Sequence, residues 1–258
     1  MFVTTCGRAN ENVIKEAMRI ASELNIPYIE RGKKSLIYHM ENQDQNCVMV
    51  GKERLELHKR KKGEEPFFFH PNSASFRIKR LMRGEKDPMV EAGGLQPGMS
   101  FLDCTLGLAS DSIIASHVVG SEGTVKGMEA NKYIASIIAE GLKNWSSPLT
   151  ELNEAMKRVE VWQGNFEDRL KECADKSVDV VYFDPMFEEG LTDSTGINPI
   201  RNWASYTPLT KEVITEAKRV ARNKVVMKNH YQSPLFEEHG FEVIKRPSAK
   251  FHFGVIRL

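Results

Sequence analysis

Four consecutive residues, Asp184-Pro185-Met186-Phe187, place a carboxylate, a proline carbonyl and an aromatic ring directly after the apolar run 178–183. An amino group on a nucleic-acid base is a poor nucleophile because its lone pair is delocalised into the ring. Acceptors on its two hydrogens, the Asp184 carboxylate and the Pro185 carbonyl, would concentrate electron density on the nitrogen and aim it. Phe187 would stack on the extruded base. The pattern predicts a site that activates an aromatic amine; an ordinary strand end with a proline turn is the structural alternative.

Polar residues also follow two earlier strands. The run SFLD ends at Asp103, and Gly107 lies in the turn that opens the next helix. Ligands of open α/β sheets bind beyond the carboxyl ends of strands, and a glycine lets the backbone approach them closely. Glu129 ends the next strand, 26 residues after Asp103, where an acidic side chain can accept from both ribose hydroxyls of an adenosine. The alternatives are a buried strand end for Asp103 and a helix N-cap role for Glu129 or Asn131.

The number of glycines in the turn after Asp103 restricts the kind of ligand that this turn can bind. Gly107 is the single glycine of residues 100–112, so the G-x-G-x-x-G motif of a dinucleotide pyrophosphate site is missing. A cationic sulfonium ligand carries no phosphate and needs no such motif. A third turn, Gly164-Asn165-Phe166, would hold an adenine, with Asn165 bonding its edge and Phe166 packing on its face. A strand-to-helix turn with a core phenylalanine explains this segment equally well.

Basic residues gather in the first third of the chain. Residues 1–90 carry 17 Lys and Arg against 12 Asp and Glu, a net charge of +5, whereas residues 91–258 carry −4. Two basic segments, 58–62 and 77–83, flank three phenylalanines at 67–69. Aromatic and basic residues together suit a nucleic-acid surface, although core phenylalanines and a solvated basic surface are the alternatives. We predict RNA contacts here by Lys59, Arg60, Arg77, Lys79, Arg80 and Arg83.

The elements that must position these residues alternate between strands and helices. We expect strands at 99–103, 124–128, 159–162, 178–183 and 222–228, and helices at 108–119, 131–143, 166–173, 210–220 and 234–239. Two strand-like runs, FEVIKRP and KFHFGVIRL, end the chain. The alternation predicts a mostly parallel sheet covered by helices on both faces, and the closing pair of strands introduces one antiparallel strand.

We predict that residues 1–65 form a small N-terminal α/β domain and that residues 66–258 form the larger domain. Apolar positions from Val13 to Leu24 have helical spacing, with Asn10 as the N-cap. The segments 28–29, 36–40 and 47–50 each have the composition of a short strand between polar turns.

The composition excludes several classes of protein. Hydrophobic residues make up 41% of the chain and charged residues 28%, as in an ordinary soluble protein. There is no run of about 18 apolar residues that predicts a membrane span, and no signal peptide pattern. The four scattered cysteines form no C-x-x-C pair, which favours a reducing, cytoplasmic location and gives no metal site. The sequence has no Walker-type loop for phosphoryl transfer, no H-E-x-x-H for zinc hydrolysis and no strand-end Pro-Cys for cytosine C5 methylation.

Over roughly residues 65–258 the chain resembles the ribosomal RNA small subunit methyltransferase J family. Members carry A-x-L-G-R-D after a D-A-T strand end, then E-R-N-P, Y-L-D-P-M-F-P and K-R-V-V-V-K. The corresponding segments here are LDCTLGLASD, MEAN, YFDPMFEEG and NKVVMK. D-P-M-F is the most specific part, because methionine replaces the second proline of the [D/N]-P-P-[Y/F] motif of amino-group methyltransferases. The implied fold is a Rossmann-like class I methyltransferase with a mostly parallel seven-stranded sheet that contains one antiparallel strand.

The resemblance implies S-adenosylmethionine as methyl donor and N2 of a guanine in small-subunit rRNA as acceptor, with RNA or the small ribosomal subunit as partner. Cofactor contacts carried over by position are Ser110, Asp111, Glu129, Ala130, Asn165, Phe166 and Asp184, which join Asp103 and Gly107. Lys228, in NKVVMK, joins the predicted RNA contacts. The chain departs from the family at Ala109 and Ser110, which replace a glycine and an arginine, and at Glu188, which replaces a proline.

Two other functions use the same residues. A methyltransferase acting on tRNA or on a small amine would need the same cofactor site. A cofactor-binding RNA module without catalysis is the third interpretation, and the intact D-P-M-F segment argues against it.

Overall fold

The computed structural model describes residues 1–61, 63–185, 200, 203 and 207–258, which divide into two compact units. The first unit contains residues 1–70, 131–145, 200 and 203, and the second contains residues 71–130, 146–185 and 207–258, in each case as far as they are described. The division of the chain into domains of residues 1–65 and 66–258 stays a prediction.

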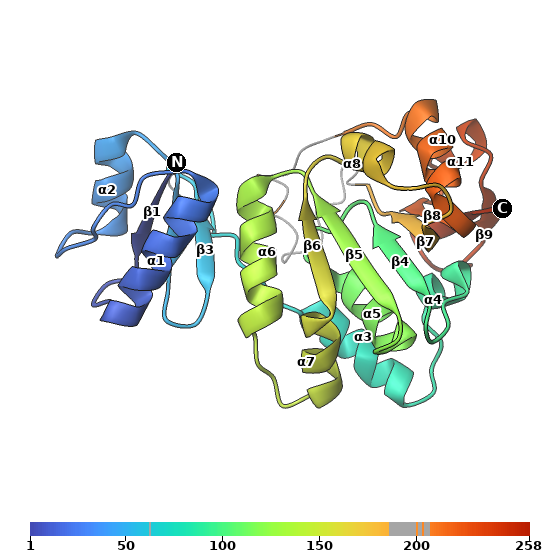
Figure 1. Ribbon diagram of the computed structural model, residues 1–258, viewed down its shortest axis with the longest axis horizontal. Helices are drawn as coiled ribbons and strands as arrows, with labels where there is room; N and C mark the ends of the chain where they lie inside the picture. Colours follow the sequence, from blue (N-terminus) through green and yellow to red (C-terminus); the bar gives the residue numbers. More distant parts are fainter. Residues whose placement is uncertain (62, 186–199, 201–202, 204–206) are drawn as a thin grey trace. The chain divides into compact units, whose positions relative to one another are not determined.

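The first unit contains a three-stranded sheet of β1 (Phe2–Thr5), β2 (Cys47–Val50) and β3 (Leu55–His58), in that order (Figure 1). β1 and β2 are parallel, and β3 is antiparallel to β2. Helix α1 (Glu11–Leu24) begins at Asn10, whose side chain accepts a hydrogen bond from the Val13 N–H at 3.0 Å. This confirms the predicted helix and its N-cap. Helix α6 (Lys132–Asn144) packs on β3.

The segment 36–40 was expected to be a strand, but it belongs to helix α2 (Leu36–Gln43). The Ser35 hydroxyl accepts from the Tyr38 N–H at 3.1 Å and so caps the helix. Met40 belongs to an apolar cluster with Phe2, and Leu36, one helical turn before Met40, packs against that cluster. The cap at Ser35 and the helical spacing of the apolar residues therefore decide the structure of this segment, although its composition is typical of a strand. Segment 28–29 forms only an isolated bridge between Tyr28 and Val3.

The second unit contains a seven-stranded sheet in the order β6-β5-β4-β7-β8-β10-β9. Its strands are β4 (Ser100–Asp103), β5 (Thr124–Glu129), β6 (Val159–Gln163), β7 (Val178–Phe183), β8 (Ala221–His230), β9 (Glu242–Ile244) and β10 (Phe251–Arg257). The first five strands along the sheet are parallel, and β10 is antiparallel to both of its neighbours. This confirms the predicted mostly parallel sheet with one antiparallel strand.

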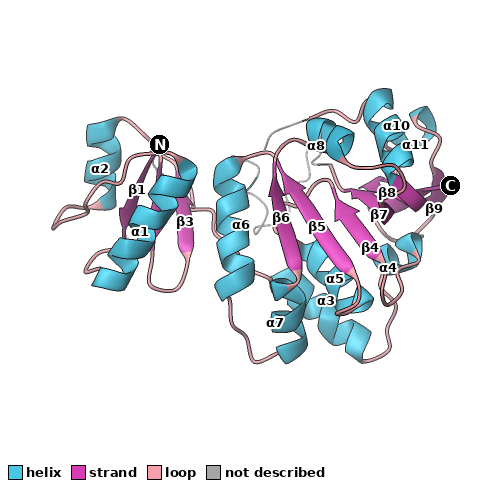
Figure 2. Ribbon diagram, in the orientation of Figure 1, coloured by secondary structure: helices cyan, strands magenta, loops and turns pink. Residues whose placement is uncertain are grey.

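Helices cover both faces of this sheet (Figure 2). They are α3 (Asn72–Met82), α4 (Pro88–Gly93), α5 (Ser110–Val119), α7 (Thr150–Lys157), α8 (Phe166–Glu172), α10 (Lys211–Val220) and α11 (Leu235–Glu238). α3, α4 and α7 pack against α5, whereas α8 packs against α10. Helix α5 connects β4 to β5, and α10 connects β7 to β8, which lies in the opposite direction along the sheet. Because such connections are right-handed, the two helices lie on opposite faces of the sheet. Among the described residues, no helix is long and apolar enough to cross a membrane.

Candidate active site

The predicted polar residues of four strands meet at one edge of the sheet. Because β4, β5, β6 and β7 are parallel, their carboxyl ends lie side by side. Asp103 and Glu129 end β4 and β5, Asn165 follows β6, and Asp184 follows β7. Hydrogen bonds join the loops: the Gly164 N–H donates to the Glu129 carbonyl at 2.9 Å, and the Asp184 N–H donates to Thr105 Oγ1 at 2.6 Å.

Asp103 is buried, and both of its carboxylate oxygens are bonded within the chain. Oδ1 accepts from the Thr105 N–H at 2.9 Å, and Oδ2 accepts from the Ser112 hydroxyl at 2.7 Å. Burial raises the pKa of Asp103 to about 7. Asp103 therefore ties the loop after β4 to the first turn of α5; a direct cofactor contact by this carboxylate stays a prediction.

The loop between β4 and α5 contains two residues with left-handed backbone. Gly107 has φ 50° and Ala109, the residue just before α5, has φ 58°. Ala109 is fully buried, and no side chain caps the helix that follows. The family's glycine at the position of Ala109 fits this conformation, because left-handed backbone is unfavourable for residues with a Cβ.

Ala109→Gly should therefore stabilise the protein by about 1 kcal/mol, since it removes the steric cost of left-handed backbone. Urea unfolding followed by circular dichroism measures this difference. Ala115→Gly, at an equally buried position inside α5, is the matched control and should lower the free energy of unfolding. Equal losses for both variants would contradict the prediction.

The other predicted cofactor residues differ in what their side chains contact. Asn131, rather than Glu129, caps α6 through the Tyr133 N–H at 2.9 Å. Asn165 caps α8 through the Glu167 N–H at 3.1 Å and donates to Thr207 Oγ1 at 3.1 Å. Phe166 is buried, and its ring packs edge to face on that of Phe183, with 5.7 Å between the ring centroids. This placement agrees with the alternative in which Phe166 is a core residue. Half-buried Ser110 and exposed Ala130 lie at the same edge as Glu129.

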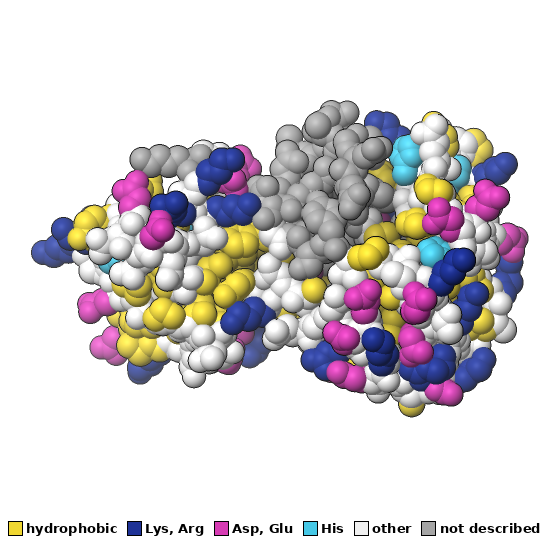
Figure 3. All heavy atoms as spheres, turned by 90° about the horizontal axis from the view of Figure 1, so that it is seen from above, with side chains coloured by type: hydrophobic (Ala, Val, Ile, Leu, Met, Phe, Trp, Pro, Cys, Tyr) yellow, Lys and Arg dark blue, Asp and Glu magenta, His cyan; other side chains and the backbone are white. Residues whose placement is uncertain are grey.

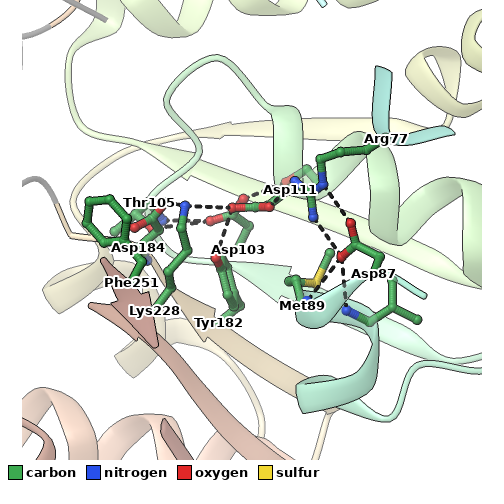
Figure 4. A network of polar contacts seen from close by, with 12 residues as sticks. Arg77, Asp87, Met89, Asp103, Thr105, Asp111, Tyr182, Asp184, Lys228 and Phe251 are labelled. Atoms are coloured by element: carbon green, nitrogen blue, oxygen red, sulfur yellow. Dashed lines mark hydrogen bonds and ion pairs between the residues drawn. The ribbon is translucent and has the colours of Figure 1, made fainter. Parts of the chain in front are cut away.

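Asp184 ends a half-buried chain of alternating charges (Figure 4). Lys228 Nζ on β8 lies 2.5 Å from Asp184 Oδ2 and 3.9 Å from Asp111 Oδ2. Asp111, in the first turn of α5, also accepts from the Tyr182 hydroxyl at 2.8 Å and from Arg77. Arg77 on α3 then holds Asp87 through two bonds, from Nε at 2.8 Å and from Nη2 at 2.9 Å. We call these five charged residues, Asp87, Arg77, Asp111, Lys228 and Asp184, the charge chain.

Neighbouring charges decide the ionisation of the charge chain. Burial opposes ionisation of Asp111, but Lys228 and Arg77 outweigh it and lower the pKa of Asp111 to about 2. Burial would lower the pKa of Lys228, but Asp184 and Asp111 raise it above its ordinary value. Burial, together with Asp111, raises the pKa of Asp184, whereas Lys228 lowers it. The ionised state of Asp184 therefore depends on Lys228.

Arg77 and Lys228, both predicted to contact RNA, are members of the charge chain, and their contact with RNA stays a prediction. Their side chains are only 20% and 27% exposed, and each already contacts two carboxylates. We therefore omit both residues from the RNA surface proposed below. Asp111 likewise serves the charge chain, and both of its oxygens are bonded to protein groups.

The remaining predicted RNA contacts lie nearer the surface. In the first unit, Lys59 lies 3.5 Å from Glu64, and exposed Arg60 pairs with Asp44. In the second unit, Lys79 and Arg83 are exposed on α3 and just after it. Glu85 pairs with Arg80 at 2.6 Å and with Arg83 at 3.2 Å. Phe67 and Phe69 are buried, so the core alternative holds for them.

The site also contains residues that the sequence reading did not single out, chiefly Asp87, Tyr182 and Thr105. Asp87-Pro88 has a local signal, an N-cap followed by proline in the first helical turn, but nothing local connects it to Arg77. The predicted base-stacking residue Phe187 lies outside the described part of the chain. The same holds for Met186, Glu188 and Lys62. No group of three His, Cys, Asp or Glu in that described part could hold a metal ion.

A seven-stranded sheet of this topology, with acidic residues at the carboxyl edge, defines a Rossmann-like class I methyltransferase. The chain belongs to the family whose model is described as "Putative SAM-dependent methyltransferase", which matches residues 32–252. S-adenosylmethionine is therefore its cofactor. The residues fit this ligand: acidic groups at the edge suit a cation with ribose hydroxyls, and the uncapped start of α5 suits its carboxylate.

Several proteins are similar to the chain in sequence. It is 47% identical over 256 residues to the uncharacterized protein YpiP of Bacillus subtilis, covering 99% of both chains. It is 28% identical over 143 residues to ribosomal RNA small subunit methyltransferase J of Marinobacter nauticus, covering 53% of this chain and 49% of that protein. The corresponding protein of Alteromonas mediterranea is 25% identical over 160 residues, with 60% of each covered. These two matches thus span about half to three fifths of the relatives' length.

A solved structure shares the fold. It is a SAM-dependent methyltransferase from Neisseria gonorrhoeae, with a TM-score of 0.64 and 15% sequence identity. The match covers 100% of this chain and 96% of that one. At this identity the similarity concerns the fold alone, and it agrees with the fold predicted from the sequence.

Proposed function

We propose that this methyltransferase acts in the cytoplasm on the exocyclic amine of a nucleic-acid base, namely N2 of a guanine in small-subunit (16S) rRNA. The observation that carries the proposal is the Asp184 carboxylate, which follows the buried strand β7 and is bonded by Lys228 at 2.5 Å. The matches to ribosomal RNA small subunit methyltransferase J proteins support rRNA as the substrate class.

In this mechanism, S-adenosylmethionine supplies a methyl group activated by its sulfonium. Asp184 accepts a hydrogen bond from the target amine, and the Pro185 carbonyl accepts the second, so that the nitrogen lone pair points toward the methyl group. Asp184 orients the amine and forms no covalent bond to it, because transfer from a sulfonium needs only in-line approach. As the new N–C bond forms, the S–C bond would break and the sulfur would leave as a neutral thioether, and the methylated nitrogen would lose its extra proton to the Asp184 carboxylate that it hydrogen-bonds. Stacking of the base on Phe187 remains a prediction, since that residue is outside the described part.

Glu129 is proposed to bind the ribose hydroxyls of the cofactor. Glu129→Gln should weaken S-adenosylmethionine binding about 10- to 100-fold, because charge-assisted hydrogen bonds are lost. Isothermal titration calorimetry measures the affinity. Glu122→Gln is the control: this exposed residue precedes β5, at the opposite end of the strand, and should leave binding unchanged. Equal affinity of both variants would reject this placement of the ribose.

The exposed cations of α3 and the turn after it are proposed to contact RNA phosphates. On the face shown in Figure 3, basic and acidic side chains are intermixed, and no large basic patch is seen. The proposal is therefore limited to the cations of α3 and the turn after it. Replacing Lys79, Arg80 and Arg83 together by glutamine should weaken RNA binding and reduce its salt slope by about 2. The same change at Lys171, Lys211 and Lys218, exposed on α8 and α10, should have a smaller effect. An unchanged slope would identify the segment as solvated surface.

The function is tested by mass spectrometry of nucleosides from a strain that lacks the protein. Loss of one N2-methylguanosine in small-subunit rRNA, restored by the wild-type chain, is the expected result. Loss confined to tRNA or to a small amine would replace the substrate while keeping the chemistry. No lost methylation in any of these pools would favour a cofactor-binding module without catalysis and would overturn the proposal.

A further inference from the structure

We propose that Lys228 is a positioning residue for methyl transfer, which keeps the Asp184 carboxylate charged and leaves one defined oxygen for the target amine. The proposal rests on the function proposed above, in which Asp184 accepts a hydrogen bond from that amine. It assigns to Lys228 a part in the reaction instead of the RNA contact that the sequence suggested.

The backbone places the two side chains next to each other. β7 and β8 are parallel neighbours, with Phe183 paired to Met227, so Asp184 and Lys228 are the next residues along each chain. The Asp184 backbone is held at the same time by its N–H bond to Thr105 Oγ1. Lys228 takes Oδ2, and no other described residue bonds to Oδ1. The carboxylate is therefore fixed at the backbone and at one oxygen, which leaves the other for an incoming donor.

The surrounding charges explain why a cation is needed here. Asp184 is faced by Asp111 from α5, Asp103 from β4, Tyr182 from β7, Arg77 from α3 and Lys228 from β8. Arg77 is already held by Asp87 and Asp111. Lys228 is thus the one described cation in direct contact with Asp184. Without it, a half-buried carboxylate beside Asp111 would take up a proton at higher pH. A protonated Asp184 is a weaker acceptor and would no longer concentrate electron density on the amine.

The chain offers a matched control for a substitution at Lys228. Lys224 lies four residues earlier on β8 and, because side chains alternate along a strand, on the same face. Its Nζ donates to the Ala92 carbonyl at 3.3 Å, so it does not contact the charge chain. Lys224→Met and Lys228→Met each remove one lysine ammonium group from β8. Only Lys228→Met removes the group that contacts Asp184.

The kinetic test measures methyl transfer against pH for the wild type, Lys228→Met, Lys228→Arg and Lys224→Met. The rate profile of Lys228→Met should be shifted toward higher pH by at least about one unit: below both midpoints its rate should be about tenfold lower than that of the wild type, because a pKa rise of one unit lowers the ionised fraction tenfold there, and above both midpoints most of the rate should return. Lys228→Arg should restore the wild-type profile to within about threefold, and Lys224→Met should match the wild type. Melting curves and cofactor affinity verify that each variant is folded.

A second measurement does not depend on enzymatic activity. Titration of the Asp184 carboxyl carbon by NMR, assigned by the signal missing in Asp184→Asn, should give a midpoint at least about one pH unit higher in Lys228→Met than in the wild type. Lys224→Met should leave that midpoint in place. An unchanged midpoint, or a rate loss equal at every pH, would overturn the role of Lys228. Failure of the wild type to methylate any RNA, with the midpoint shift present, would instead overturn the proposed function alone.

Discussion

Asp184→Ala should reduce methyl transfer to a verified RNA substrate by about a hundredfold or more, with the fold and cofactor binding retained. The alanine removes the acceptor that aims the amine, and loss of one well-placed electrostatic contact has effects of this size. It also leaves Lys228 without its nearest carboxylate, although Asp111 remains 3.9 Å away to stabilise the cation. Single-turnover rates with saturating cofactor separate the chemical step from binding.

Two further variants make the result on Asp184 interpretable. Asp184→Asn keeps a carbonyl acceptor at nearly the same place, so its loss should be smaller than that of alanine. Asp175→Ala changes an aspartate whose side chain is 75% exposed and should leave the rate unchanged. Near-normal methylation by Asp184→Ala would show that the D-P-M-F segment is structural and that the catalytic assignment fails.

The second large effect is expected for Arg77→Met, which should destabilise the protein by about 3–5 kcal/mol near pH 7. Removing one partner of a buried ion pair leaves the other charges uncompensated, here Asp87 and Asp111. Urea unfolding measures the difference. Arg80→Met, on the same helix but in a more exposed pair with Glu85, should cost less than about 1 kcal/mol. Similar losses for the two variants would contradict the half-buried charge chain.

The pH dependence of this difference has a definite sign. In the wild type, Lys228 and Arg77 overcome burial and lower the pKa of Asp111 to about 2, below its ordinary value near 4. Its contribution to stability is therefore complete above about pH 4 and lost as the pH falls toward 2. In Arg77→Met the pKa of Asp111 is higher, so protonation relieves the uncompensated charge earlier. The stability gap between the two proteins should narrow as the pH falls from about 5 to 3.

The sequence predicted the parts of the site that local pattern determines. Asp103 and Glu129 end strands and Asp184 follows one. Parallel strands bring such residues to one edge, so their proximity could be expected. The partners of Arg77 and Lys228 could not be expected. Arg77 is 10 residues from Asp87 and 34 from Asp111, and Lys228 is 44 residues from Asp184. A basic residue has the same local pattern whether it meets a phosphate, solvent or a buried carboxylate.

The charge chain also has a consequence for the motions of the second unit. It joins α3, the start of α4, the first turn of α5, β7 and β8. Separating any of these elements from the rest would leave an unpaired charge in the interior, which is more costly than losing apolar contacts of similar extent. Partial opening of one element alone is therefore unfavourable, and we expect the five to open as a single cooperative unit in native-state fluctuations. Local fraying is left to segments outside the charge chain, such as β9 at the edge of the sheet.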